Sequence, residues 1–227
     1  MIRAAAVAVL MAAMCFAEGA FAQRWSPQRN VEVIVPSSAG GSLDTTGRTI
    51  TRIWSDLKLL TVSSSISNRP GGGHAVAYNF LAQRAGDPHI MAVTSMTLLA
   101  NHITGHIPQT YTDFTPMSVL LTEYIAIAVR AESPLKTGKD LIDALRKAPN
   151  SLSLALSSAA GGTHHMSFAM PLLSGGVDVT KAKFVVFNSS GEAVTALLGG
   201  HVDVISAGTV QVAPFVTSGK LRVLAVS

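Results

Sequence analysis

The sequence predicts an α/β protein of two lobes, each with a central sheet flanked by helices. Short β-branched runs alternate with helical stretches from residue 31 onward, a pattern typical of parallel sheets covered by helices. Loops rich in glycine and hydroxyl residues follow strands in both halves of the chain, which favours a ligand cleft between two lobes. The length of 227 residues, 48% of them hydrophobic and 13% charged, suffices for two modest lobes.

The N-terminus has the order of a secretory signal peptide over residues 1–22. Arg3 precedes an apolar stretch over residues 4–17, and Ala20-Phe21-Ala22 provides the small residues of a cleavage site. This stretch is shorter than the roughly 18 to 20 residues that span a bilayer, so we expect cleavage after Ala22 rather than a membrane anchor. Cys15 is the only cysteine, so the mature chain is expected to contain neither a disulfide nor a thiol nucleophile.

The formal net charge of +4 favours the binding of small anions through general electrostatics. Nucleic acid is not an expected partner, because only 6% of the residues are aromatic and no cluster of lysine or arginine forms a basic stripe.

Each expected element has a local signal. The first strand, over residues 31–35, is a β-branched run that ends at Pro36 and a glycine-rich turn, and Asp44 then favours the start of a helix. Further apolar runs predict strands over residues 61–65, 89–94, 117–121, 125–130, 152–156, 183–187, 202–206 and 221–226. The stretches between them predict helices over about 44–58, 74–84, 138–147, 163–173, 192–198 and 210–217.

Three loops are the best candidates for ligand contact: residues 36–44, 157–165 and 188–192. Their glycines allow close approach of the backbone, and the amides at a following helix start can hold an anion. An ordinary strand-to-helix turn would have a similar sequence. The first loop matches neither a phosphate-binding loop, since no lysine follows Gly41, nor a nucleophile elbow, since Asp44 stands where a glycine is needed.

The histidines and carboxylates give weak signals for metal binding or catalysis. His164 and His165 point about 100° apart on a helix, so a shared metal is not expected, and one of them is expected to face the cleft. His102 and His106 are four residues apart, but Gly105 and Pro108 oppose a helix there. For the carboxylates we expect structural roles: Asp44 at a helix start, Glu192 as a helix cap and Asp203 at a strand end.

The order and spacing of several phrases resemble the receptors of tripartite tricarboxylate transporters, the TctC or Bug family of periplasmic solute-binding proteins. The resemblance covers essentially the whole mature chain. Its phrases are Ile34-Val35-Pro36 with Ala39-Gly40-Gly41 and Asp44, Asn68-Arg69-Pro70-Gly71-Gly72-Gly73, Asp113-Phe114-Thr115-Pro116-Met117-Ser118, the loop 161–165, the run 191–200 with Val202-Asp203, and the run 219–226.

The resemblance implies a type II periplasmic-binding-protein fold that clamps its ligand between the lobes. It divides the chain into a first lobe over residues 23–124, a second lobe over 125–222 and the start of a return crossing over 223–227. Family members continue back into the first lobe, so we expect this chain to be a truncated copy without that return segment.

The resemblance also implies the ligand contacts. A carboxylate is expected to be held by backbone amides, hydroxyls and ordered water. The expected contacts are Ser38, Ala39, Gly40, Gly41, Ser42, Thr94, Ser95, Thr97, Ala159, Gly161, Gly162, Thr163, His164, His165, Ser189, Ser190, Ser206 and Gly208.

The expected function is that of a monomeric periplasmic receptor, without a cofactor or catalytic activity. It would deliver a small carboxylate-containing molecule to the membrane subunits of a tripartite tricarboxylate-type transporter. The alternatives are a non-functional truncated copy, a secreted metal-binding receptor, and a secreted hydrolase that uses Ser158 or Thr163 with one of the two adjacent histidines.

Overall fold

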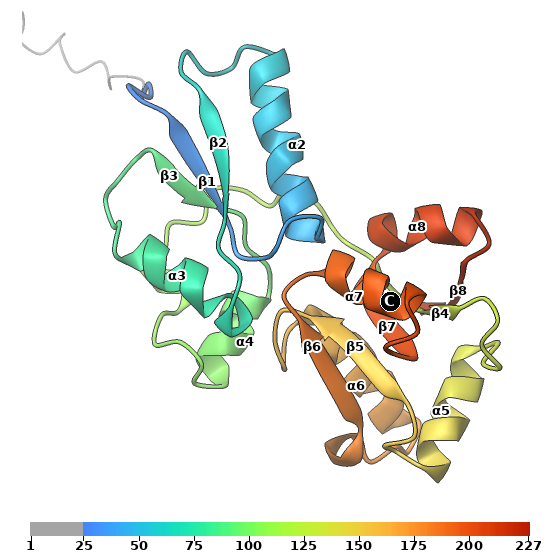
Figure 1. Ribbon diagram of the computed structural model, residues 1–227. Helices are drawn as coiled ribbons and strands as arrows, with labels where there is room; N and C mark the ends of the chain where they lie inside the picture. The colour runs from blue at the N-terminus through green and yellow to red at the C-terminus, as the bar shows by residue number, and fades with distance from the viewer. Residues whose placement is uncertain (1–24) are drawn as a thin grey trace, which may run out of the picture.

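The computed structural model describes residues 25–227. The expected signal peptide, with Cys15, lies outside the described residues. The described part forms one sheet of three strands and one of five, each accompanied by helices. Figure 1 shows them as two lobes, the first in blue to green and the second in yellow to red. The expected two-lobed α/β fold is confirmed.

The first sheet is parallel and has β1 at its centre. Its strands, in the order β2-β1-β3, are Ser64–Asn68, Val31–Val35 and Ile90–Ala92. Val33 of β1 pairs with Ile66 on one side and with Met91 on the other. The β-branched side chains of β1 are buried, as is usual for a strand that is covered on both faces.

The helices of the first lobe are α2 (Ser42–Asp56), the short 3₁₀ helix η2 (Gly72–His74), α3 (Ala75–Ala82), α4 (Thr97–Ile103) and the 3₁₀ helix η3 (Tyr111–Asp113). Gly47 brings α2 close to the sheet, because a Cβ at this position would lie 3.0 Å from a methyl of Val35 and 3.2 Å from Ile66 Cδ1. The close packing fixes the start of α2 at the edge of the lobe that faces its neighbour (Figure 1).

The second sheet is mixed. Its strands, in the order β6-β5-β7-β4-β8, are Lys183–Phe187, Ser153–Ser157, Val204–Gly208, Ile125–Arg130 and Leu221–Val226. β5 is parallel to β6 and β7, whereas β4 is antiparallel to β7 and β8. The prediction of parallel sheets is therefore wrong for β4, which runs antiparallel to both of its neighbours. β4 enters from the first lobe, so no helical crossover of the second lobe sets its direction.

Helices cover both faces of this sheet. They are α5 (Gly138–Lys147), α6 (Thr163–Ser174), the 3₁₀ helix η4 (Val179–Lys181), α7 (Ser190–Leu198) and α8 (Thr209–Thr217). α5 begins with a capping box, in which Thr137 and Asp140 each accept a hydrogen bond from the other's backbone N–H. This cap provides hydrogen-bond partners at the helix start, where the first backbone amides have none within the helix.

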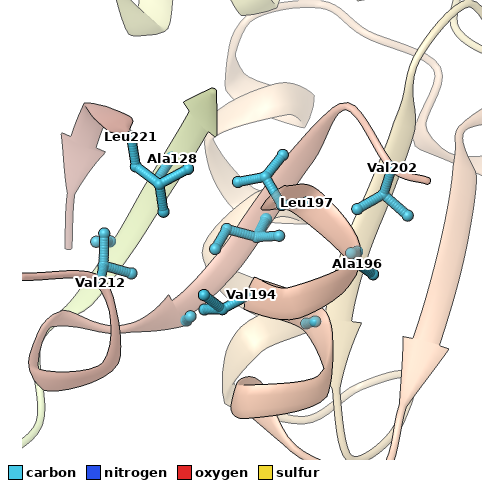
Figure 2. Packing of buried hydrophobic residues seen from close by; sticks show 12 residues of the cluster. Ala128, Val194, Ala196, Leu197, Val202, Val212 and Leu221 are labelled. Carbon is cyan, nitrogen blue, oxygen red and sulfur yellow. The ribbon is translucent and has the colours of Figure 1, made fainter. Parts of the chain in front are cut away.

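The side chains of β4 alternate between two hydrophobic clusters. Ala126 and Ala128 face α7 and α8 (Figure 2), whereas Ile127 and Val129 face α5 and α6. In the first cluster Leu197 of α7 is fully buried, and in the second Leu145 of α5 is fully buried. The strand is thus buried on both faces, and it anchors the link from the first lobe in the core of the second.

The predicted strand over residues 117–121 is wrong. In the described part of the chain this segment pairs with no strand, and Met117 and Val119 are 78% and 90% exposed. An apolar, β-branched sequence has a tendency to form a strand, but the strand forms only when another edge provides hydrogen bonds.

Some predicted boundaries shift, and one helix was missed. The strand expected over 61–65 is observed as β2, because Val31 of β1 pairs with Ser64 and the ladder extends to Asn68. The strand expected over 202–206 begins two residues later, at Val204. Helix α4 was not predicted, since its seven residues end just before the Gly105 that opposed a helix.

We expect Leu145→Ala to lower the free energy of unfolding by about 2 to 5 kcal/mol, because it removes a fully buried side chain between α5 and the sheet. Chemical denaturation followed by circular dichroism measures the change. The control is Leu173→Ala, a side chain that is 57% exposed on α6; its effect should stay within about 0.5 kcal/mol. Equal losses for the two variants would contradict this assignment of the core.

Candidate functional site

A small cavity lies where the two lobes meet. Its volume is about 30 Å³, room for roughly two water molecules. Both lobes and the link before β4 contribute to it. The lining residues are Ser37, Gly41, Ser42, Leu43, Ser95, Thr97, Glu123, Ser157, Ser158, Thr163, His164, Ser189 and Ser190.

Four helices begin at this cavity, each with a hydroxyl residue in its first position. Ser42 starts α2 and Thr97 starts α4 in the first lobe, while Thr163 starts α6 and Ser190 starts α7 in the second. The first amides of a helix lack partners within it and carry partial positive charge. Together with the hydroxyls they provide hydrogen-bond donors for an anion.

Asp44 holds the loop after β1 in shape. Its carboxylate accepts hydrogen bonds from the Gly40 N–H at 2.9 Å, from Arg48 Nε at 2.8 Å and from Asn68 Nδ2 at 2.9 Å. Burial acts to raise the pKa of Asp44, but these bonds outweigh it and hold the pKa below its ordinary value. The expected structural role at a helix start therefore agrees with an ionised, fully hydrogen-bonded carboxylate.

The first loop lies directly against the second lobe. The Ser38 N–H donates to the Asn188 carbonyl at 3.3 Å. A Cβ at Gly41 would lie 3.0 Å from Ser189 Cβ, and one at Gly191 would lie 2.9 Å from the Gly40 carbonyl oxygen. Only glycine allows backbones to approach this closely, so these glycines bring the starts of α2 and α7 together.

The loop after β5 provides the second-lobe wall. Ser158 and Gly161 have positive φ angles of 80° and 85°, a conformation that L residues other than glycine adopt rarely. The Gly161 N–H donates to His165 Nδ1 at 3.0 Å, and the His165 ring packs edge-on against Phe184 with centroids 4.7 Å apart. His165 thus stabilises the loop from behind and does not line the cavity.

His164 is the histidine that lines the cavity. It is buried, and its Nδ1 lies 3.3 Å from Ser206 Oγ, which is 2.7 Å from Ser167 Oγ. Burial lowers the pKa of His164 to about 4. The ring is therefore neutral at pH 7, and it gives the cavity a polar group without a charge.

A second buried histidine, His74, was missed by sequence reasoning. It has φ +81°, is 2% exposed, and neither ring nitrogen has a hydrogen-bond partner. Burial, and then the charge of His164, lowers the pKa of His74 to about 4. The sequence signal near His74 is the run of glycines over residues 71–73. A Cβ at Gly73 would lie 2.7 Å from Ala159 Cβ of the other lobe, so this position requires glycine.

Within residues 25–227, no hydroxyl that lines the cavity has a side-chain hydrogen bond to a histidine. Ser206 lies beside His164 but is completely buried, so a substrate does not reach it. Ser157 is 3.3 Å from Ser190, and Ser95 is 3.2 Å from Thr97, pairs of hydroxyls without a base. Among residues 25–227, Ser158 and Thr163 make no side-chain hydrogen bond to a histidine, which a nucleophile with a general base requires.

The structure places the expected ligand contacts in two groups. Those that line the cavity are Gly41, Ser42, Ser95, Thr97, Thr163, His164, Ser189 and Ser190. Those that do not line it are Ser38, Ala39, Gly40, Thr94, Ala159, Gly161, Gly162, His165, Ser206 and Gly208. The other lining residues were not among the expected contacts: Ser37, Leu43, Glu123, Ser157 and Ser158. Four of these lie within the expected loops over residues 36–44 and 157–165, but Glu123 comes from the link between the lobes and was missed.

Over residues 25–227, no three His, Cys, Asp or Glu side chains gather as metal ligands would. His102 and His106 do not share a helix, because α4 ends at Ile103. Within the same residues, every helix is too short or too polar to cross a bilayer.

The comparisons with known proteins agree with this architecture. A family model described as "Tripartite tricarboxylate transporter family receptor" (TctC) matches residues 55–227. The chain belongs to this family. The UPF0065 protein in the gbd 5' region of Cupriavidus necator is 29% identical over 199 residues, which are 87% of this chain and 59% of that protein. Protein BugT of Bordetella pertussis is 25% identical over 204 residues, 88% of this chain and 61% of BugT. The chain spans about 60% of the length of these relatives.

Solved structures of similar proteins share the fold. A structure of a periplasmic transporter superposes with a TM-score of 0.79 at 26% identity, over 88% of this chain and 66% of that one. A Rhodopseudomonas palustris protein solved with adipate gives 0.78 at 27% identity, over 88% and 66%. MatC from the same species, solved with bound malate, gives 0.75 at 25% identity, over 88% and 67%.

We expect the protein to lose stability as the pH falls from about 6.5 to 4. In the unfolded chain a histidine binds its proton near pH 6.5, whereas His74 and His164 have folded pKa values of about 4. The unfolded state therefore takes up protons first, and each histidine costs on the order of 3 kcal/mol by the acid end of this window.

Denaturant unfolding at several pH values measures the loss, and NMR titration of the histidine ring protons identifies the groups. Two rings should stay neutral at pH 5.5. If every histidine titrated near its ordinary value, the assignment of these two as buried and neutral would be wrong.

Proposed function

We propose that this protein is a periplasmic solute receptor that captures a small carboxylate-containing molecule between its two lobes. The observation that carries the proposal is the meeting of four helix starts, each with a hydroxyl, at one cavity. A carboxylate bound there would accept hydrogen bonds from amides and hydroxyls at the positive ends of helices. Family membership and the relatives solved with malate and adipate support the same class of ligand.

Capture would work by closure of the lobes. The donors belong to both lobes, so a ligand gains its full set of hydrogen bonds only when the lobes are together. A ligand stabilises the closed state in proportion to its preference for that state. In this structure the lobes touch at Ser38, Gly41 and Gly73, the contacts that closure would involve.

The proposal also covers the location of the receptor and its partners in the cell. We propose that the receptor acts as a monomer in the periplasm, and that it delivers its ligand to the membrane subunits of a tripartite tricarboxylate-type transporter. The family to which the chain belongs supports this role. The expected ligand contacts that line the cavity form the proposed binding site.

A thermal-shift screen of residues 23–227 against dicarboxylates, tricarboxylates, amino acids and aromatic acids tests the proposed function. We expect one class to raise the melting temperature in a saturable way, because a ligand that binds only the folded state stabilises it by mass action. A cooperative melt that no acid shifts would contradict the proposal, and the absence of a cooperative melt would favour a non-functional chain.

Closure itself is tested by Gly73→Ala. The new Cβ would lie 2.7 Å from Ala159 Cβ across the lobe contact, so we expect roughly tenfold weaker binding of any acid found in the screen. Gly86→Ala is the matched control: Gly86 also has a positive φ, of 81°, but a Cβ there meets nothing within 4 Å. Isothermal titration calorimetry compares the two. Equal affinities would show that this contact does not limit closure.

A further inference from the structure

Glu123 is the one lining residue with a formal charge at neutral pH, among those that the described chain contributes to the cavity. The remaining side chains are hydroxyls, the apolar Leu43 and the neutral His164. Over residues 25–227, no basic side chain lies within 4.0 Å of the Glu123 carboxylate. The cavity therefore carries a negative charge without a counter-ion from the protein.

The Glu123 carboxylate lies next to groups of both lobes. Glu123 lies two residues before β4, and its Oε1 occupies the space beside Gly208, where a Cβ would overlap with it. The same Cβ would lie 2.6 Å from Gln211 Oε1 and 2.7 Å from Ser42 Oγ. Ser42 Oγ donates to Gln211 Oε1 at 2.9 Å. Glu123 of the link, Gln211 of the second lobe and Ser42 of the first lobe thus lie around Gly208, and a side chain at position 208 would overlap with them.

The charge bears on which ligand can bind. The donors at the starts of α2, α6 and α7 serve one carboxylate of a ligand. Because Glu123 lines the same cavity as these helix starts, the other end of a short ligand would come close to its carboxylate. Glu123 is an exposed residue at the edge of the cavity. A second carboxylate would meet a like charge there, whereas a cationic nitrogen would gain a charge-assisted hydrogen bond to Glu123.

We propose that Glu123 makes this site selective for short ligands that pair a carboxylate with a cationic nitrogen, over dicarboxylates of the same length. The inference rests on the proposed receptor function and names its ligand class. Two relatives were solved with the dicarboxylates malate and adipate, so the proposal sets this chain apart from those proteins.

A purely structural role for Glu123 would affect stability and not ligand selectivity. The carboxylate lies near the start of α8, where a negative charge favours the helix dipole. A role limited to that helix end would change stability but would leave the ratio of affinities for two ligands unchanged. The decisive measurement is therefore the selectivity and not the melting temperature.

The experiment uses pairs of probes with equal chain length: glycine and malonate, β-alanine and succinate, and 4-aminobutanoate and glutarate. Titration calorimetry at pH 7.5 compares the wild-type protein with Glu123→Gln, which keeps the size and removes the charge. The control is Glu132→Gln, an exposed glutamate paired with Arg130 outside the cavity. Circular dichroism verifies that the variants fold.

We expect wild type to bind the amino acid of at least one pair tenfold or more tightly than its dicarboxylate. Glu123→Gln should bring that ratio to within about threefold, and Glu132→Gln should preserve it. Preference for the dicarboxylate in wild type, or an unchanged ratio in Glu123→Gln, would overturn the selectivity and leave the receptor function intact. Absence of binding for all six probes and for the acids of the broader screen would overturn both.

Discussion

The site depends on the close approach of backbone between the two lobes. At Gly41, Gly73, Gly162 and Gly191, a Cβ would lie between 2.7 and 3.1 Å from an atom of the opposite lobe. Ordinary side chains at these positions would hold the lobes apart, and the starts of α2, α4, α6 and α7 would no longer share a cavity. The hydroxyls and amides have a common target only because these glycines lack side chains.

The polar groups around the cavity are held in defined charge states by burial and hydrogen bonding. Asp44 is buried but stays ionised, because its oxygens accept bonds from Gly40, Arg48 and Asn68. His164 stays neutral because burial disfavours its charged form, and the Ser206 hydroxyl lies beside its Nδ1. The lining provides donors without formal positive charge, so recognition of an anion would rely on short-range hydrogen bonds and on the directions of helix dipoles.

Local signals predicted most of the fold. The bounds of β1, β4, β6 and β8 agree with their apolar runs, and α5 agrees with the helix predicted over residues 138–147. The segment over residues 117–121 has the same kind of sequence but no strand partner in the described chain. The direction of β4 also depends on which lobe the chain comes from, and a local pattern does not encode that.

The candidate site was predictable where a loop carries its own signature. The loops after β1, β5 and β6 have glycines, hydroxyls and a following helix, and the structure brings all three together. Glu123 has no such signature, and the only signal near His74 is the run of glycines over residues 71–73, which was not read as part of the site. The lobe contacts of Gly73 with Ala159 and of Glu123 with Gly208 join segments far apart in the sequence, so a local pattern does not predict them.

The link before β4 has a mechanical consequence. Between η3, which ends at Asp113, and β4, which starts at Ile125, the described chain passes from one lobe to the other without helix or strand. Within residues 25–227 this is the single covalent passage between the lobes (Figure 1). A single connecting segment resists neither bending nor rotation of one lobe about the axis of the segment. Two parallel connecting segments would resist that rotation. In the part of the chain that the structure describes, the mutual orientation of the lobes is therefore specified by the complementary shapes of the touching loops and not by the link.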